Sequence, residues 1–228
     1  MKRVTLTRLT MSRFMITFIV MAIVGFGACG GRAPLAERVD VSGSSAAGSV
    51  GAVRAEGCRL VVENGVGFVV APGLVATVAH AVQGQHSITF DGAPAELAAL
   101  DVRSDTAILR VATKKPSLGF GVAIEKNAVS VVLVGSEIDA HVLSVVTITH
   151  TDVPTKKTVV RLGFILDKPM QFGNSGAPVA DASGAVVGMV YATAADTDQA
   201  AYAVASSEIQ TTLALAKSGP RPLPGECA

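Results

Sequence analysis

Tryptophan is absent from the sequence, and only 4% of the residues are aromatic. Charged residues are also scarce at 16%, whereas half of the residues are hydrophobic. So little charge beside so much apolar side chain excludes a chain that is disordered throughout. The formal net charge of +1 supplies no basic surface, so we expect no nucleic-acid partner.

The sequence also lacks long stretches with the apolar periodicity of an α-helix. Nothing in the middle of the chain repeats apolar residues every 3.6 positions, which excludes βαβ units. Short apolar runs instead alternate with turn residues, and Asn64-Gly65 predicts a tight hairpin turn. About ten strands at this spacing predict an all-β fold, and residues 207–217 predict one C-terminal helix. The predicted strands are 59–63, 66–70, 74–78, 87–90, 95–102, 107–112, 129–134, 141–149, 158–166, 185–192 and 200–204.

The N-terminus combines positive charge with an apolar run, as an export signal does. Four lysine and arginine side chains lie before residue 14, and the 15 residues 14–28 are almost wholly apolar. Since a membrane-spanning helix needs about 20 apolar residues, we predict a signal peptide over residues 1–28. An uncleaved anchor is an alternative that the short run disfavours.

Cys29 follows this run in GFGAC, which resembles a bacterial lipobox, where the cysteine is lipidated and becomes the mature N-terminus. A lipobox usually has Leu three residues before the cysteine, where this chain has Phe26. Lipidation would leave Cys58 and Cys227 as an even pair, and in an oxidising compartment we expect a disulfide between them. Ordinary cleavage near Gly27, which gives a soluble secreted protein, is the alternative.

Residues 29–51 are small, polar and poor in large apolar side chains, as a flexible tether would be. We therefore expect the folded domain over residues 52–228. The Cys58–Cys227 disulfide would join the two ends of that domain and close a long loop, which the chain-entropy model values at about 5 kcal/mol.

Ser175 lies in GNSGAPV, a run that a polar turn alone would explain. A serine hydroxyl becomes a strong nucleophile only when an imidazole takes its proton and a carboxylate orients the imidazole. All histidines precede Ser175, which excludes the Ser–acid–His order of α/β-hydrolases. They are His80, His86, His141 and His150.

His80 lies in LVATVAHAV, at the end of an apolar strand. Either a buried histidine that is hydrogen-bonded to backbone groups or a catalytic base would fit there. Asp105, in SDTAILRV, comes just before an apolar strand and is a candidate for the acid. Asp101 is a close competitor, and either residue could instead cap a turn. Their positions in the sequence do not choose between them.

Three segments in the order ATVAHAV, SDTAILRV and GNSGAPV resemble the catalytic segments of trypsin-fold serine proteases. GAVVGMVYA resembles the strand that lines the cleft in that family, and AYAVASSEI resembles its last strand and the start of its helix. The resemblance covers roughly residues 58–217 and is nearest to HtrA-like and MarP-like periplasmic proteases. It implies a chymotrypsin-like fold of two packed six-stranded antiparallel β-barrels with a C-terminal helix.

The resemblance also implies roles for individual residues. His80, Asp105 and Ser175 would form the catalytic triad, and the N–H groups of Gly173 and Ser175 would form the oxyanion hole. Ala177 departs from the family pattern, in which Gly is commoner. A neutral pocket for an apolar P1 side chain would be lined by Pro169, Met170, Gln171, Tyr191 and Ala192. We expect neither a metal nor a cofactor.

The sequence therefore predicts an exported serine endopeptidase that hydrolyses peptide bonds through an acyl-enzyme. Lipid on Cys29 would tether it to a membrane of the cell envelope, on the periplasmic or extracellular face. Its partners would be protein or peptide substrates. Two other functions stay open, a binding module that keeps the protease fold without activity and a stress sensor that cleaves itself.

Overall fold

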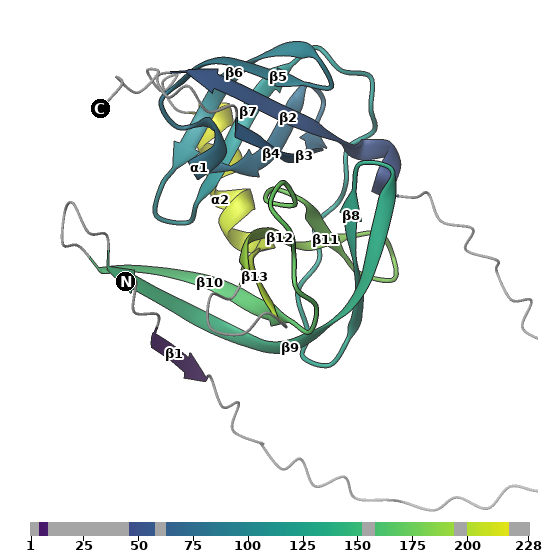
Figure 1. The fold of residues 1–228 in the computed structure, drawn as a ribbon, viewed down its shortest axis with the longest axis vertical. Coiled ribbons are helices and arrows are strands. Elements are labelled where there is room, and N and C mark those ends of the chain that lie inside the picture. Colours follow the sequence, from purple (N-terminus) through teal and green to yellow (C-terminus); the bar gives the residue numbers. More distant parts are fainter. Residues whose placement is uncertain (1–4, 9–45, 58–62, 152–157, 194–199, 219–228) are drawn as a thin grey trace, which may run out of the picture.

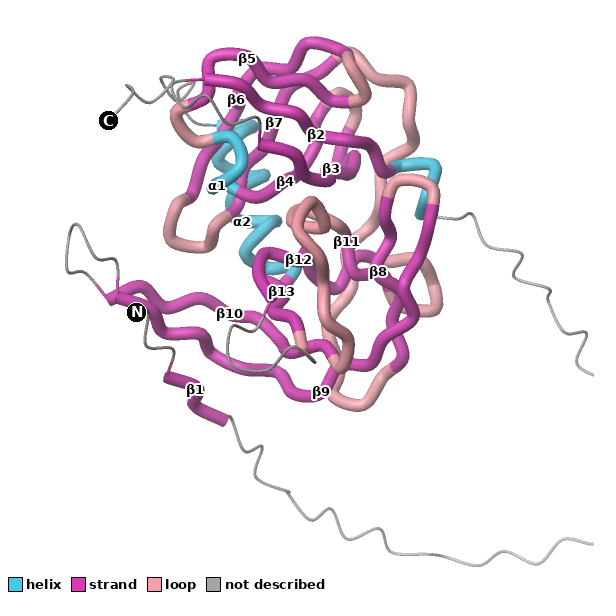
Figure 2. Tube along the Cα trace, viewed as in Figure 1, coloured by secondary structure: helices cyan, strands magenta, loops and turns pink. Residues whose placement is uncertain are grey.

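The computed structural model describes residues 5–8, 46–57, 63–151, 158–193 and 200–218. Strands dominate this part of the chain, as the magenta tube in Figure 2 shows. They close into two antiparallel β-barrels that lie one above the other in Figure 1. The predicted fold, two packed six-stranded barrels with a C-terminal helix, is confirmed.

The first barrel has the strand order β2-β3-β4-β7-β6-β5, and β5 pairs with β2 to close it. All five residues of β4, LVATV, are buried because this strand lies between β3 and β7. Phe68 and Phe90 fill the interior, and burying each such side chain stabilises the fold by about 2–3 kcal/mol. The strands are β2 (Val50–Gly57), β3 (Glu63–Ala71), β4 (Leu74–Val78), β5 (Gln85–Phe90), β6 (Ala93–Asp101) and β7 (Thr106–Val111).

The second barrel has the order β8-β9-β10-β13-β12-β11, and β11 pairs with β8 to close it. Phe164, Leu166 and Met189 are fully buried inside it. The strands are β8 (Ala128–Leu133), β9 (Ser136–Thr151), β10 (Thr158–Leu166), β11 (Pro178–Ala180), β12 (Val186–Thr193) and β13 (Ala201–Ala205).

The C-terminal helix α2 (Ser206–Ser218) leaves the second barrel after β13 and packs on β6 and β7 of the first. Its buried residues Ile209, Thr212, Leu213 and Ala216 follow helical spacing and therefore share one face. The hydroxyl of Ser206 donates to Gly121 O, 2.6 Å away, in the segment that links the barrels. Two short elements complete the described part, η1 (Ala46–Ser49) and α1 (Ala79–Val82).

The hairpin turn predicted at Asn64-Gly65 is wrong. β3 runs through both residues, and they pair with Arg54 and Val53 of β2. Gly65 is required for a different reason, since a Cβ there would lie 2.9 Å from the carbonyl oxygen of Ser175.

The domain also begins earlier than the predicted boundary at residue 52. Ala46 in η1 and Val50 at the start of β2 are buried in the core. β2, VGAVRAEG, contains few large apolar side chains, and its composition therefore resembles that of a tether.

Four residues of the predicted signal peptide form a short strand, β1 (Thr5–Arg8), that pairs antiparallel with residues 146–149 of β9. β8 stops pairing with β9 at His141, which leaves the later part of that edge open to another extended segment.

Cys29, Cys58 and Cys227 lie outside the described residues, so the lipidation and the disulfide stay predictions. Within the described ranges, no helix is both long enough and apolar enough to cross a membrane. In the same ranges, no group of three or more His, Cys, Asp or Glu side chains is arranged to hold a metal ion.

Candidate active site

His80 and Asp105 form a doubly hydrogen-bonded pair at one end of the first barrel. His80 lies in α1, directly after β4, and Asp105 lies in the turn before β7. The His80 N–H donates to Asp105 Oδ1 at 2.9 Å, and Nδ1 lies 2.8 Å from Oδ2. Because an ionised carboxylate can only accept, Nδ1 is the donor, and the lone pair of the neutral ring is on Nε2. The side chain of His80 is 48% exposed.

Asp105, and not Asp101, is the carboxylate that contacts His80. The Asp101 carboxylate accepts hydrogen bonds from the backbone N–H, Nε and Nη2 of Arg103, at 3.0–3.1 Å. Burial raises the pKa of Asp101, but these bonds and the charge of Arg103 outweigh it, so that pKa lies below its ordinary value. Asp105 has a φ of +56°, a left-handed conformation that costs a non-glycine residue about 1–2 kcal/mol.

Ser175 belongs to the second barrel but is held against the first. Its carbonyl oxygen accepts a 2.8 Å hydrogen bond from Val66 N–H of β3. The carbonyl of Val66 accepts in turn from Thr77 Oγ1, at 2.8 Å, in β4. Thr77 comes three residues before His80, so this docking places the Ser175 segment beside the strand end that carries the histidine.

The residues before Ser175 form a turn suited to a type II geometry. Asn174 N–H donates to Gln171 O at 3.0 Å, and Gly173, the third residue of the turn, has a φ of +90°. Asn174 Oδ1 also accepts from Gln171 N–H at 2.7 Å, which fixes the turn from the side chain. Among the described residues, the N–H groups of Gly173 and Ser175 donate to no protein acceptor.

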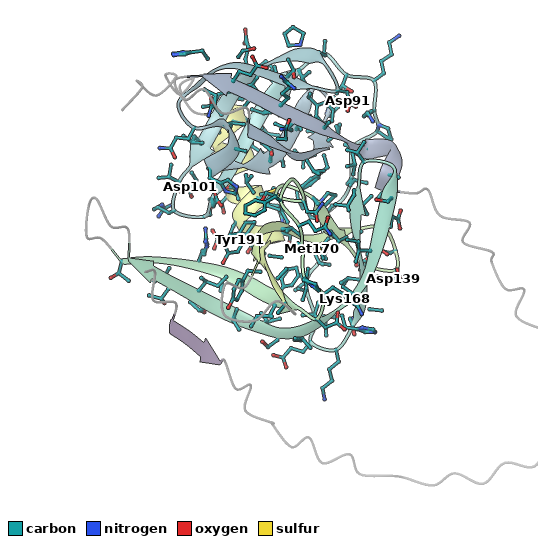
Figure 3. The ribbon with its side chains drawn as sticks, viewed as in Figure 1. Asp91, Asp101, Asp139, Lys168, Met170 and Tyr191 are labelled. Atoms are coloured by element: carbon teal, nitrogen blue, oxygen red, sulfur yellow. The ribbon has the colours of Figure 1, made fainter. Side chains whose placement is uncertain are left out.

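Tyr191 and Met170 lie near the boundary between the two barrels, as Figure 3 shows. Tyr191 occupies a β-bulge in β12, since the register with β13 shifts between Val190 and Ala192. Burial raises the pKa of Tyr191, the charge and hydrogen bond of Arg161 lower it, and the nearby charges of Tyr202 and Asp105 raise it, with a net rise.

Sequence reasoning missed Arg161, because nothing local links β10 to Tyr191 thirty residues later. Its guanidinium carbon lies 4.0 Å from the centroid of the Tyr191 ring, within cation–π range. Of the other residues predicted for the pocket, Pro169 and Gln171 are exposed and Met170 is buried. The backbone of Ala192 pairs with Tyr202 of β13.

A second His–Asp pair anchors the start of the loop that leads to Ser175. His141 N–H donates to Asp167 Oδ1 at 2.7 Å, Nδ1 lies 3.1 Å from Oδ2, and Asp167 N–H donates to His141 O at 3.1 Å. Burial raises the pKa of Asp167, but the hydrogen bonds and charge of His141, with the charge of Lys168, bring it below its ordinary value of 3.8.

Comparison with protein families decides which family carries this arrangement. The model of the trypsin-like peptidase domain matches residues 65–189, which contain His80, Asp105 and Ser175 and make up more than half of the chain. This chain belongs to the trypsin-like peptidase family.

Two serine proteases of Mycobacterium tuberculosis, Rv3671c (strain H37Rv) and MT3772 (strain CDC 1551), are each 28% identical to it over 170 residues. The match covers 69% of this chain and 43% of each relative's length, so the chain spans less than half of these proteins.

Solved structures agree with the family. The active form of the Rv3671c protease superposes with a TM-score of 0.71 at 26% identity, covering 80% of this chain and 86% of that one. An inactive form of the same protease gives 0.65 at 26% identity, covering 77% and 91%. The HtrA-type protease AlgW with a tripeptide gives 0.63 at 16% identity, covering 75% and 60%, and shows the fold alone. Family and relatives together support serine protease activity.

Gly176→Ala should break the docking of the Ser175 segment. Gly176 has a φ of +89°, and an added Cβ would overlap Val66 O and lie 2.8 Å from Thr77 Oγ1. Backbone strain and overpacking together predict a loss of about 2–5 kcal/mol in the free energy of unfolding, measured by denaturant titration. Gly135→Ala is the matched control, because Gly135 has a φ of +78° with nothing within 4 Å. Equal losses in the two variants would show that close approach is not the constraint.

Asp167→Asn should lower stability in a pH-dependent way. Since the folded-state pKa of Asp167 is depressed, its contribution is fully present above the unfolded value of 3.8 and disappears as pH falls through the folded value. Because the His141–Asp167 pair is partly exposed, the free energy of unfolding of the variant should lie about 0.5–1 kcal/mol below that of the wild type at about pH 5. Chemical denaturation at stepped pH should show this gap closing as the pH falls below 3.8. A gap that stays constant would refute this account.

Proposed function

We propose that the chain is an exported serine endopeptidase that cleaves protein or peptide substrates through an acyl-enzyme. The observation that carries the proposal is the His80–Asp105 pair, with bonds of 2.8 and 2.9 Å, at the strand end beside which the Ser175 segment is docked. Family membership and the serine protease relatives favour this reading of the geometry.

In this mechanism Ser175 Oγ attacks the scissile carbonyl while His80 Nε2 accepts its proton. Asp105 holds the proton of the neutral ring on Nδ1 and stabilises the imidazolium that forms. The N–H groups of Gly173 and Ser175 would bind the developing oxyanion, consistent with their lack of an acceptor among the described residues. His80 then donates its proton to the leaving amine, and water attacks the acyl-enzyme by the same route in reverse.

Export and tethering rest on the N-terminal sequence. A positively charged start and an apolar run of 15 residues support a signal peptide over residues 1–28. Cys29 would carry the lipid, which would tether the domain from about residue 46 onward to a membrane of the cell envelope, on its periplasmic or extracellular face. Cys58 and Cys227 would then pair in an oxidising compartment.

A fluorophosphonate probe tests the enzymatic proposal, because it reacts with an activated serine and needs no known substrate. We expect labelling of the wild type between about pH 5 and 8, and loss of at least about 10³-fold in rate in Ser175→Ala and His80→Ala. Asp105→Asn should slow labelling by about 10⁴-fold, since the wrong tautomer is then held. Gel fluorescence over time gives each rate.

Ser183→Ala and His86→Ala are the matched controls, because both side chains are exposed and lie outside the site. They should label at the rate of the wild type. Absence of labelling in a folded wild type would instead favour a binding module that keeps the protease fold.

The P1 pocket should be neutral apart from the guanidinium of Arg161, which lies over the Tyr191 ring. Lys168 directly precedes the predicted pocket residues Pro169 and Met170, and its side chain is exposed. The carboxylate of Asp167, the residue before it, is hydrogen-bonded to His141. Cleavage of a peptide library, read by mass spectrometry, should therefore favour apolar P1 residues over charged ones by about tenfold or more, the size of one or two buried methylene groups. A dominant preference for Arg or Lys would contradict this assignment.

A further inference from the structure

The strained residue Asp105 is flanked by two buried hydroxyl side chains. Ser104 and Thr106 are 1% and 0% exposed, and their hydroxyl oxygens lie 2.7 Å apart. The Asp105 carbonyl also accepts from Ala79 N–H at 3.1 Å. A left-handed aspartate persists only when its surroundings fix it, so the groups on both sides of Asp105 determine where its carboxylate points.

The two hydroxyls are linked to the C-terminal helix. Thr106 Oγ1 is hydrogen-bonded to Oγ1 of Thr212 in α2, and Thr212 is also fully buried. Thr212 Oγ1 lies 3.2 Å from Glu208 O, and at the other end Ser104 Oγ lies 3.5 Å from Asp101 O. Each hydroxyl has one proton to donate. The two ends of the chain compete for these protons, because Thr212 can donate to Glu208 O and Ser104 also hydrogen-bonds the side chain of Asp101.

Helix α2 is well placed to hold this chain of hydroxyls. It continues directly from β13, which pairs with β12, and Val190 of β12 is bonded to Gly176 and Ala177. It also packs on β6 and β7, the two strands that flank the Asp105 turn. The hydroxyl chain is thus a polar connection from the helix of one barrel to the acid-bearing turn of the other.

We propose that Thr212 is a positioning residue for the candidate catalytic acid, acting through Thr106 and Ser104 on the backbone of Asp105. This inference rests on the proposed function. The hydrogen bonds of Thr212 go to Thr106 and Glu208, so it acts on Asp105 only through its neighbours. Its hydroxyl is hydrogen-bonded to Thr106 Oγ1, which keeps the turn in the conformation that aims both carboxylate oxygens at His80. A small shift of that turn would misalign the imidazole without changing the groups that bind substrate.

The test is Thr212→Val, which keeps the branched shape and removes the hydroxyl, with Thr212→Ser restoring the hydroxyl alone. Thr211→Val is the matched control, because Thr211 is exposed on the same helix and its hydroxyl bonds only to Ser207 O. In the full chain, we expect Thr212→Val to lower kcat on a library-derived peptide by about 10–100-fold with KM unchanged. Thr212→Ser should recover most of that loss, and Thr211→Val should match the wild type.

Proton NMR of the unreacted protein gives a readout that does not need activity. The His80 Nδ1 proton, held against a carboxylate, gives a low-field resonance, which Thr212→Val should shift or broaden while Thr212→Ser and Thr211→Val leave it in place. Wild-type kcat and an unchanged resonance in a folded Thr212→Val would overturn the inference, as would equal losses in kcat for Thr212→Val and Thr211→Val. A wild type without activity but with the resonance altered in Thr212→Val would overturn the proposed function and leave the positioning role standing.

Discussion

The hydrogen bond from Val66 N–H to the carbonyl oxygen of Ser175, 2.8 Å long, joins the two barrels at the site, and the geometry of the site depends on it. Such a close approach of two backbones leaves no room for side chains, so glycine is needed on both sides of the contact. A Cβ on Gly65 would lie 2.9 Å from Ser175 O, and one on Gly176 would overlap Val66 O. Gly176 N–H in turn donates to Val190 O, so the segment is held between a strand of each barrel.

This constraint explains why the chemistry-bearing residues can come from distant parts of the chain. His80 and Asp105 are joined to each other within the first barrel by two hydrogen bonds. Ser175 arrives on a turn fixed at Gln171 and Asn174, and at the start of its loop by the pair His141–Asp167. The Val66–Ser175 hydrogen bond then brings the serine-bearing turn against the barrel that carries the histidine and the acid.

The sequence predicted the fold class well because alternating short apolar runs and turn residues reflect the barrel strands directly. The interval 158–166 matches β10, and 207–217 lies within α2. It failed where a residue serves a distant contact. Asn64-Gly65 has the composition of a turn, yet the glycine is there for Ser175, more than a hundred residues later. Position alone did not choose between Asp101 and Asp105, and only the family resemblance selected Asp105, because the difference depends on Arg103 and on a left-handed backbone, neither of which has a periodic signal.

The barrels are joined at two places that differ in kind. The first is the backbone hydrogen bond between Val66 and Ser175, which needs glycine on both sides. The second is the buried hydrogen bond between the hydroxyls of Thr106 and Thr212. The backbone hydrogen bond sets the distance between β3 and the serine, whereas the hydroxyl hydrogen bond sets the orientation of the turn that carries Asp105. Both contacts lead to the sheet of the second barrel. The Ser175 segment is bonded to β12, and α2 continues from β13, which pairs with β12. A movement of one barrel against the other therefore strains both contacts together.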